Sequence, residues 1–223
     1  MNSKIVAMLL ALLAAGAQAD PADARKEYER ARYFSGQTGE RLDLRQAHVH
    51  LRNAARQGHV PAQVDLAFVY FNGNEQVARD LSQSFHWFRQ GAAGGSVTAQ
   101  CMLGDFYKSG LGGASKDARE AVKWYRLTAA KDDRCASKSQ YELYAAYESG
   151  QGVTKDLETA TAWLKKAADA GNPRAQATLG RAFRKGYGVP QSDELARQWL
   201  RKSREGVAPH DDEEEEHGRQ HKH

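Results

Sequence analysis

The chain has 223 residues, of which 41% are hydrophobic and 27% are charged, and its formal net charge is +4 at pH 7. When residues 1–19 and those after Arg204 are set aside, 29 basic and 21 acidic side chains remain. This excess is too diffuse along the sequence to indicate a nucleic-acid-binding protein. It favours an acidic partner, or an interaction with the chain's own acidic tail.

The first residues, MNSKIVAMLLALLAAGAQA, have the pattern of a secretory signal peptide. Lys4 precedes an apolar run from Ile5 to Ala15, and the small-residue triplet that ends at Ala19 is typical of a cleavage site. The apolar run is nearer half of the roughly 20 residues that a membrane anchor needs. We therefore expect cleavage after Ala19 and a mature chain in the bacterial periplasm or outside the cell.

Four tryptophans recur at intervals of 37, 39 and 36 residues, which is the signature of an internal repeat. Each follows a segment with a small first residue, leucine fifth, an aromatic ninth and glycine twelfth: AQVDLAFVYFNG, AQCMLGDFYKSG, SQYELYAAYESG and AQATLGRAFRKG. The apolar positions of these segments fall on one face of a helix, and the glycine is suited to end that helix in the left-handed conformation.

A second helix is expected after each glycine. A short loop leads to an aspartate or serine that can accept the free N–H groups of a helix start, at Asp80, Asp117, Asp156 and Ser192. The tryptophan on this second helix is expected to fill the core of the two-helix unit.

A weaker copy of the unit precedes the four clear ones. It has Gly36 in the turn, Asp43 at the second helix start and Leu51 in the place of the tryptophan. The sequence therefore predicts five repeats, at about 26–59, 60–96, 97–134, 135–172 and 173–204.

The repeated residues resemble the Sel-one-like repeat, a relative of the tetratricopeptide repeat. The resemblance rests on a small residue, Leu-Gly, Tyr, Gly-x-Gly-Val, Lys-Asp, Ala, Trp-Tyr or Trp-Leu, and then Ala-Ala and Gly, and it covers residues 33–203. It implies an all-α fold, a right-handed α/α solenoid of about five helix–turn–helix repeats. It is specific for fold and poor for function.

Two segments depart from the family pattern. The stretch with Ala78 and Arg79 replaces the usual glycine-valine turn after Gly73, and the link KDDRCASKS has extra residues.

The chain has two cysteines. Cys101 lies near the start of a first helix, and Cys135 lies just after the second helix of the same repeat, so the two ends are expected to be neighbours. An exported chain with two cysteines usually pairs them, and secreted members of the family that this chain resembles join the helices of a repeat in a similar way. We predict a structural disulfide; a redox-active pair is disfavoured because C-x-x-C is absent.

The sequence has no recognisable catalytic motif. It lacks the G-x-S-x-G, S-x-x-K and K-T-G strings of serine hydrolases and penicillin-binding proteins, and the H-E-x-x-H of zinc hydrolases. The Gly-x-Gly strings at Gly150 and Gly186 follow helices rather than strands, which predicts hairpin turns and not phosphate loops. We expect no catalytic residue, no cofactor and no metal site in the repeats.

The residues from 205 onwards form a tail that is predicted to be disordered, because HDDEEEEHGRQHKH has no apolar residue to bury. Four of the eight histidines lie in it beside six carboxylates, which are plausible metal ligands. A solvated tail without a partner is the alternative.

The expected binding surface is the concave face, which the first helices line in helical solenoids. On the repeat register, positions 4, 7 and 11 of each first helix point away from the core, and the groove runs from apolar through acidic to basic. The predicted partner-binding residues are Phe68, Phe71, Met102, Asp105, Glu142, Arg181, Arg184 and Lys185. Alternatively, Phe68 and Phe71 seal the junction with the first repeat.

The sequence thus predicts a non-enzymatic, exported and monomeric scaffold that binds a protein or peptide partner in the cell envelope. The resemblance implies an adaptor in envelope assembly, signalling or secretion. An enzyme of cell-wall or β-lactam chemistry is one alternative, and a protein that sequesters metal through the tail is another. Neither nucleic acid nor a membrane span is expected.

Overall fold

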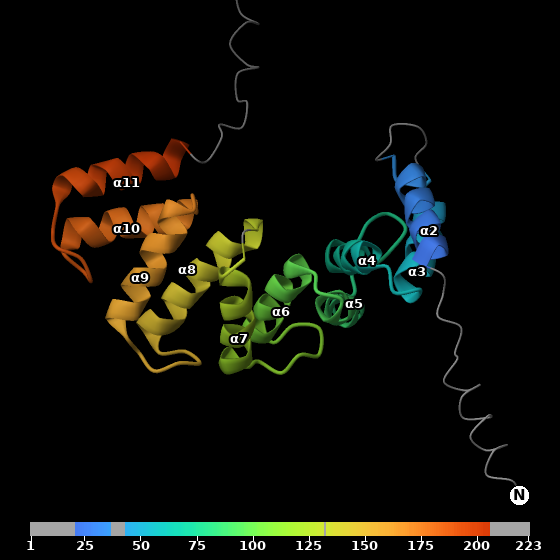
Figure 1. The fold of residues 1–223 in the computed structure, drawn as a ribbon, viewed down its shortest axis with the longest axis horizontal. Coiled ribbons are helices and arrows are strands. Elements are labelled where there is room, and N and C mark those ends of the chain that lie inside the picture. Colours follow the sequence, from blue (N-terminus) through green and yellow to red (C-terminus); the bar gives the residue numbers. More distant parts are fainter. Residues whose placement is uncertain (1–20, 37–42, 132, 206–223) are drawn as a thin grey trace, which may run out of the picture. The chain divides into compact units, whose positions relative to one another are not determined.

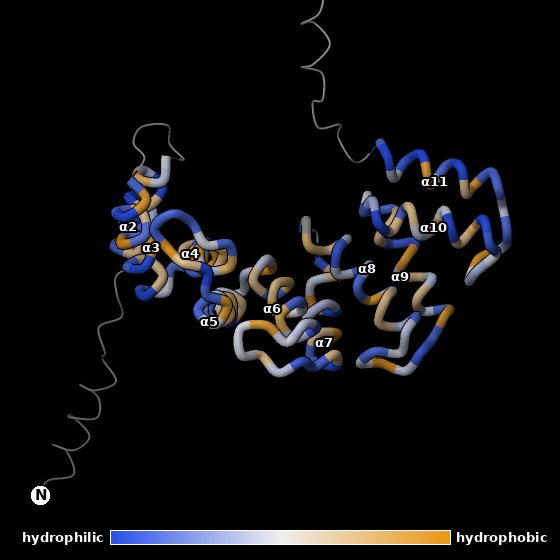
Figure 2. The backbone as a smooth tube through the Cα atoms, turned by 180° about the vertical axis from the view of Figure 1, so that it is seen from behind, coloured by the Kyte–Doolittle hydropathy of each residue, from blue (hydrophilic) through white to orange (hydrophobic). Residues whose placement is uncertain are grey.

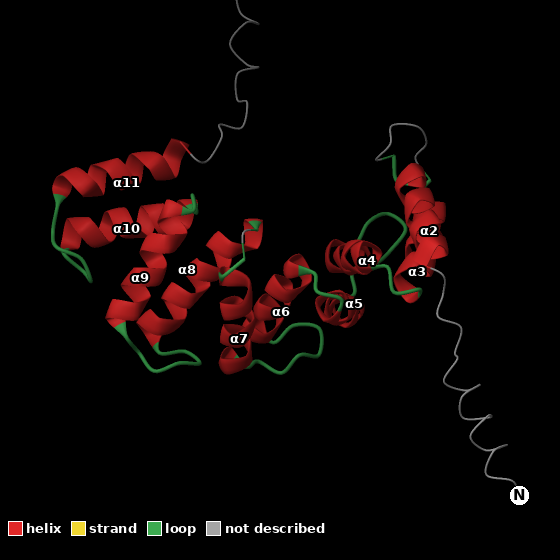
Figure 3. Cartoon of the chain, in the orientation of Figure 1, coloured by secondary structure: helices red, strands yellow, loops and turns green. Residues whose placement is uncertain are grey.

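A computed structural model of the chain describes residues 21–36, 43–131 and 133–205. The predicted signal peptide, and the acidic and histidine-rich part of the predicted tail, lie outside these residues. The described residues form ten helices and no strand, which confirms the predicted all-α class (Figure 3). The helices are α2 (Pro21–Phe34), α3 (Leu44–Arg56), α4 (Val60–Asn72), α5 (Leu81–Ala93), α6 (Val97–Ser109), α7 (Ala118–Ala129), α8 (Arg134–Ser149), α9 (Leu157–Asp169), α10 (Pro173–Lys185) and α11 (Asp193–Glu205).

The chain divides into two compact units, Met1–Asp117 and Ala118–His223. The first contains α2 to α6 and the second contains α7 to α11 (Figure 1). Within each unit, consecutive helices pack against each other, and the hairpins α2–α3, α4–α5, α8–α9 and α10–α11 make the closest pairs. None of the described helices is long and apolar enough to cross a membrane.

The second helices begin where the sequence predicts. The carboxylates of Asp43, Asp80 and Asp156 each accept hydrogen bonds from backbone N–H groups two or three residues further on, and the Ser192 hydroxyl accepts one from Leu195 N. Because these N–H groups have no partner within the helix, each cap fixes the residue at which the helix starts.

Gly152 shows why the turns need glycine. Its φ is +76°, which side-chain-bearing residues rarely adopt, and a Cβ there would collide with the backbone of Ala118 and Arg119. The turn between α8 and α9 therefore packs directly against the start of α7.

The turn after Gly73 keeps its valine, contrary to the expectation that the glycine-valine pattern is lost there. Val77 is buried and lies three residues before its cap Asp80, as Val189 does before Ser192. The Asn74 side chain closes the turn by accepting hydrogen bonds from the backbone of Gln76 and Val77.

The core of each unit consists of small and aliphatic residues on the inner faces of the helices. Hydrophobic and hydrophilic residues alternate along most helices, as an amphipathic helix requires (Figure 2). The leucine at the fifth position of the first helices is buried in every clear repeat, as Leu66, Leu103, Leu143 and Leu179.

The tryptophans line these cores rather than fill them, which corrects the prediction: Trp87 and Trp199 pack against the core clusters of their units from the side. All four are only partly buried, and the ammonium groups of Lys166 and Lys202 lie 4.6 and 4.5 Å from the ring centroids of Trp163 and Trp199. Successive side chains on a helix point about 100° apart, so the residue after the tryptophan enters the core instead. This holds for Phe88, Tyr125 and Leu164, each no more than 2% exposed, whereas Leu200 after Trp199 is only partly buried.

Cys135 lies in a helix and not in a link. Asp133 caps α8 by accepting a hydrogen bond from Cys135 N, and this helix has 16 residues, where α4, α6 and α10 have 13. Cys101 is buried in α6, in the other unit. Because the two cysteines lie in different units, the disulfide between Cys101 and Cys135 stays a prediction.

Candidate partner-binding pockets

The predicted partner-binding residues fall in two groups, one in each unit. Phe68, Phe71, Met102 and Asp105 lie on α4 and α6 and are partly buried. On α8 and α10, Glu142 is partly buried, whereas Arg181, Arg184 and Lys185 are exposed. The single groove predicted from the sequence would draw on both units and stays a prediction.

In the second unit, a pocket of about 430 Å³ lies between α8, α10 and the turn after α10. Arg181 and Lys185 line it together, as the register predicts. The Nη2 atom of Arg181 donates a hydrogen bond to the hydroxyl of Thr178, one turn earlier on the same helix, at 3.0 Å. Arg184 does not line this pocket.

Two tyrosines that the sequence argument missed form the other walls of this pocket, Tyr144 on α8 and Tyr187 in the turn. The Tyr187 hydroxyl donates a hydrogen bond to Glu148 Oε1 at 3.3 Å, and 44% of Tyr187 is exposed. Tyr187 lies between Gly186 and Gly188, and this position in the turn is the only feature of the sequence that could have identified it as a pocket residue. We name these residues, Tyr144, Thr178, Arg181, Ala182, Lys185, Gly186 and Tyr187, the basic pocket.

The phenols of the basic pocket stay protonated over the physiological range. Burial raises the pKa of Tyr144, and the Glu148 carboxylate raises it further. Desolvation, followed by the charge and hydrogen bond of Glu148, raises the pKa of Tyr187. Both side chains are thus neutral phenols; the Tyr144 hydroxyl can donate to a carboxylate, whereas the Tyr187 hydroxyl already donates to Glu148.

The charge of the basic pocket is positive. Among the described residues, neither Arg181 nor Lys185 forms an ion pair, and Glu148 is the acidic group nearest to the two tyrosines. The pocket can bind a carboxylate or another anion through the guanidinium of Arg181 and the ammonium group of Lys185. Its two tyrosine rings can contact an apolar group attached to that anion.

In the first unit, a smaller pocket of about 320 Å³ lies between α2, α3 and α4. Phe68 and Asp65 line it, and Tyr28 donates a hydrogen bond to Asp65 Oδ2 at 2.7 Å. Burial and this bond raise the pKa of Tyr28 to about 12. The ring of Phe68 also packs edge-on against the fully buried Phe88, with 5.0 Å between centroids, so Phe68 has a packing role besides any binding role.

The remaining predicted residues of the first unit lie apart from this pocket. The Phe71 ring is 6.0 Å from that of Phe106 and 5.8 Å from the Arg79 guanidinium. Phe71 thus packs toward the third repeat, and not against the first repeat as the alternative reading of the sequence had it. Met102 and Asp105 lie on α6 and line neither pocket.

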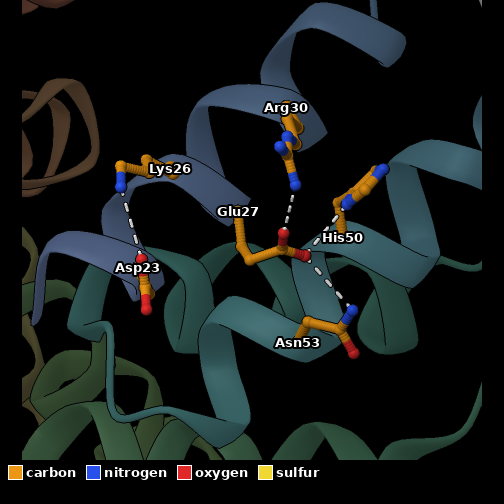
Figure 4. Close-up of polar contacts among 6 residues, drawn as sticks. All are labelled: Asp23, Lys26, Glu27, Arg30, His50 and Asn53. Carbon is orange, nitrogen blue, oxygen red and sulfur yellow. Dashed lines mark hydrogen bonds and ion pairs between the residues drawn. The ribbon is translucent and has the colours of Figure 1, made fainter. Parts of the chain in front are cut away.

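The histidines of the repeats have structural partners. His50 Nδ1 lies 2.9 Å from Glu27 Oε2, and the ring of His50 stacks on Phe34 (Figure 4). His59 accepts a hydrogen bond from Ala62 N and so caps α4. Among the described residues, no three His, Cys, Asp or Glu side chains are grouped so that they could hold a metal ion.

The comparisons with known proteins concern fold more than chemistry. The Sel1 repeat family model matches residues 27–59, 60–96, 97–133, 137–172 and 173–206. A crystal structure of c5321, described as a protective antigen present in uropathogenic Escherichia coli strains and displaying an SLR fold, is 38% identical with a TM-score of 0.72. The match covers 82% of this chain but 38% of that one. A Sel1 repeat protein from Oxalobacter formigenes is 24% identical over 86% of this chain and 74% of its own, with a TM-score of 0.76.

A search of curated proteins finds no match. Each of the five matched segments overlaps two helices that follow one another in the sequence, from α2 and α3 to α10 and α11, and together the segments span most of the chain. The predicted family and the predicted solenoid of about five repeats are therefore confirmed: the chain belongs to the Sel1 repeat family.

Proposed function

We propose that this protein is an exported, non-enzymatic scaffold that binds a protein or peptide partner, and that the basic pocket receives an acidic segment of that partner. Sel1 repeat proteins generally mediate protein–protein interaction, and the repeat scaffold is typically non-catalytic. The observation that carries the proposal is the pairing of Arg181 and Lys185 with two tyrosine walls in one pocket.

The chemistry of the basic pocket fits a carboxylate next to an apolar or aromatic group. Arg181 and Lys185 supply two positive charges against the single negative charge of Glu148. Electrostatic attraction of this kind speeds the encounter with an acidic partner, whereas the aromatic surface slows dissociation.

The site of action that we propose is the bacterial periplasm or the cell exterior. The support is the signal-peptide pattern of residues 1–19, with its charged start, apolar run and Ala17-Gln18-Ala19 triplet. In that compartment the monomeric chain would act as an adaptor for proteins of the envelope.

The test is capture from an envelope extract with the mature chain as bait. The double variant Arg181→Glu with Lys185→Glu should lose proteins that the wild type retains at about 50 mM salt, because like charge then faces the acidic segment. The matched control is Lys165→Glu with Arg197→Glu, which makes the same charge change at exposed positions of α9 and α11 outside the pocket. Equal retention by both double variants would refute the role of the basic pocket.

A second arm of the test uses Glu148→Gln, which removes the single negative charge beside the pocket tyrosines. This variant should bind the captured partner more tightly at low salt and equally at about 300 mM salt, since exposed charges are screened within about 10 Å at 0.1 M. Weaker binding by Glu148→Gln would show that the partner's segment is not acidic.

A further inference from the structure

The last repeat carries a marked excess of positive charge. Residues 173–205 contain eight Arg and Lys side chains and three Asp and Glu side chains: Arg174, Arg181, Arg184, Lys185, Arg197, Arg201, Lys202 and Arg204 against Asp193, Glu194 and Glu205. Of these, only Arg201 and Glu205 form an ion pair among the described residues. The net charge of +5 is thus largely uncompensated within the repeat.

The sequence that follows has the opposite charge. Residues 211–216 read DDEEEE, six consecutive acidic side chains that begin six residues after the end of α11 at Glu205. The run carries six negative charges, which are opposite in sign to the +5 of the repeat and nearly equal to it in number.

The geometry of the last hairpin brings the basic pocket within reach of this run. Helices α10 and α11 lie side by side in Figure 1, and a side chain at Gly180 would meet Leu200 and the carbonyl of Ala196. Gly180 of α10 therefore lies beside Leu200 of α11. From Leu200 to the end of α11 at Glu205 is five residues, or about 8 Å along the helix axis. The residues from Glu205 to Asp211 span up to about 20 Å when extended, and those from Glu205 to Glu216 up to about 36 Å, so the run is long enough to follow the hairpin back along α10.

We infer that the acidic run Asp211–Glu216 occupies the basic pocket of its own chain, with carboxylates on Arg181 and Lys185, when no outside partner is bound. The inference uses the same pocket as the proposed function but requires no outside partner. A short tether gives an effective concentration on the order of 1 mM. A tail segment with a Kd of about 100 µM would then weaken a competing acidic ligand about ten-fold.

Zero-length carbodiimide cross-linking of the full chain tests this contact directly, because it joins a carboxylate to an ammonium group only when the two touch. Mass spectrometry should find amide bonds from Lys185 to residues 211–216. Lys165 on α9 is also exposed and lies outside the pocket, so it serves as the internal control. No cross-link at Lys185, or cross-links at Lys185 that are no more frequent than at Lys165, would overturn the inference.

The same experiment on a mixture of ¹⁴N and ¹⁵N chains identifies the source of the tail. Cross-links within chains of one label support the inference, and cross-links of mixed label show contact between two copies and overturn it. Arg181→Glu should reduce the Lys185 cross-link at least three-fold, whereas Arg197→Glu on α11 should not. A thermal melt of each variant shows that the repeat is still folded.

A binding measurement separates this inference from the proposed function. A fluorescent peptide of residues 206–223 is titrated into the wild type and into a full-length variant whose six acidic residues 211–216 are changed to Asn and Gln. The variant should bind about ten-fold more tightly than the wild type. Equal binding to both chains overturns the tail contact but leaves the pocket as an acceptor of acidic partners. No binding to either chain overturns the tail contact and also removes the support for an acidic-segment pocket.

Discussion

The carboxylate of Glu27 on α2 joins two residues of α3: its Oε2 atom lies 2.9 Å from His50 Nδ1 and 3.2 Å from Asn53 Nδ2 (Figure 4). Its other oxygen accepts a hydrogen bond from Arg30. These bonds fasten the first helix of the described chain to the second, in the repeat that has no tryptophan.

Glu27→Gln should destabilise the first repeat by about 1 kcal/mol, since it weakens hydrogen bonds that a charged acceptor makes. Hydrogen bonding from His50 is the first cause that lowers the pKa of Glu27 below its ordinary value of 4.5. A depressed carboxyl pKa contributes stability that is present above the unfolded pKa and is lost as the pH falls through the folded one. The effect of Glu27→Gln should therefore be full at pH 7 and shrink below about pH 4.5.

The matched control for Glu27→Gln is Asp23→Asn on the same helix. Asp23 pairs with Lys26 at 3.4 Å, but both side chains are more than 60% exposed, and such pairs contribute little. Hydrogen exchange of α2 at pH 7 measures both variants, and an equal loss of protection in the two would contradict a specific role for Glu27.

His59 should make the first unit sensitive to mild acid. Its ring accepts a hydrogen bond from Ala62 N at the start of α4, which requires the unprotonated nitrogen. Burial lowers the pKa of His59, and Arg25 lowers it further against the opposing charges of Asp65 and Glu29. A lowered histidine pKa gives stability that is complete above about pH 6.5 and declines as the pH falls toward the folded value.

His59→Asn should reduce this pH dependence, because asparagine can cap without titrating, as Asn172 does for α10. The melting temperature should fall less between pH 7.5 and pH 5.5 in the variant than in the wild type. Burial also lowers the pKa of His48, so part of the dependence remains. His86→Asn, at an exposed position of α5, is the control. A steeper pH dependence in His59→Asn would refute the role of the cap.

Leu143→Ala should cost about 2 to 5 kcal/mol of stability, because Leu143 is fully buried in α8 and its truncation leaves a cavity. Leu127→Ala in α7 makes the same chemical change at a position that is 44% exposed, and it should change stability by less than about 1 kcal/mol. Urea unfolding monitored by circular dichroism measures both. Similar losses for the two variants would mean that the inner faces of α7 and α8 are assigned incorrectly.

Gly152→Ala should be more destabilising than Gly171→Ala. Both glycines have positive φ, so each substitution costs about 1 to 2 kcal/mol through backbone strain. A Cβ at Gly152 also meets the Ala118 backbone, whereas a Cβ at Gly171 has nothing within 4 Å. Overpacking adds about 1 to 3 kcal/mol to the first variant only. Thermal melts of the two variants give the comparison directly, and a smaller loss for Gly152→Ala would disprove the close packing of this turn.

Much of the fold was predictable because the same residues that begin and end helices recur in each repeat. The caps at Asp80 and Asp156, and the glycine ends at Gly150 and Gly186, depend only on backbone groups within a few residues. The tryptophan position was wrong for a different reason. Size alone suggested that Trp163 fills the core, but the core lies about 100° round the helix, where Leu164 is.

The basic pocket was only partly predictable. Arg181 and Lys185 followed from the register of one helix, since residues four apart share a face. Tyr144 comes from the preceding repeat and Tyr187 from a turn, so their approach depends on how two repeats stack. That stacking is decided by contacts between helices, which no spacing within one repeat reveals.

The last prediction is that Cys101 and Cys135 form a disulfide in the exported chain. The two cysteines are 34 positions apart, and closing a loop of this size stabilises a protein by about 3 to 4 kcal/mol on the chain-entropy model. Thiol labelling in denaturant without reductant should find no reactive cysteine. Denaturant is needed because Cys101 is only 1% exposed. Cys135 is only partly buried, so Cys135→Ser should disturb packing little and act mainly by removing the disulfide. The variant should therefore lose as much stability as the wild type loses when reductant is added. Two labelled thiols per chain, with no effect of Cys135→Ser, would rule out the bond and remove one argument for export.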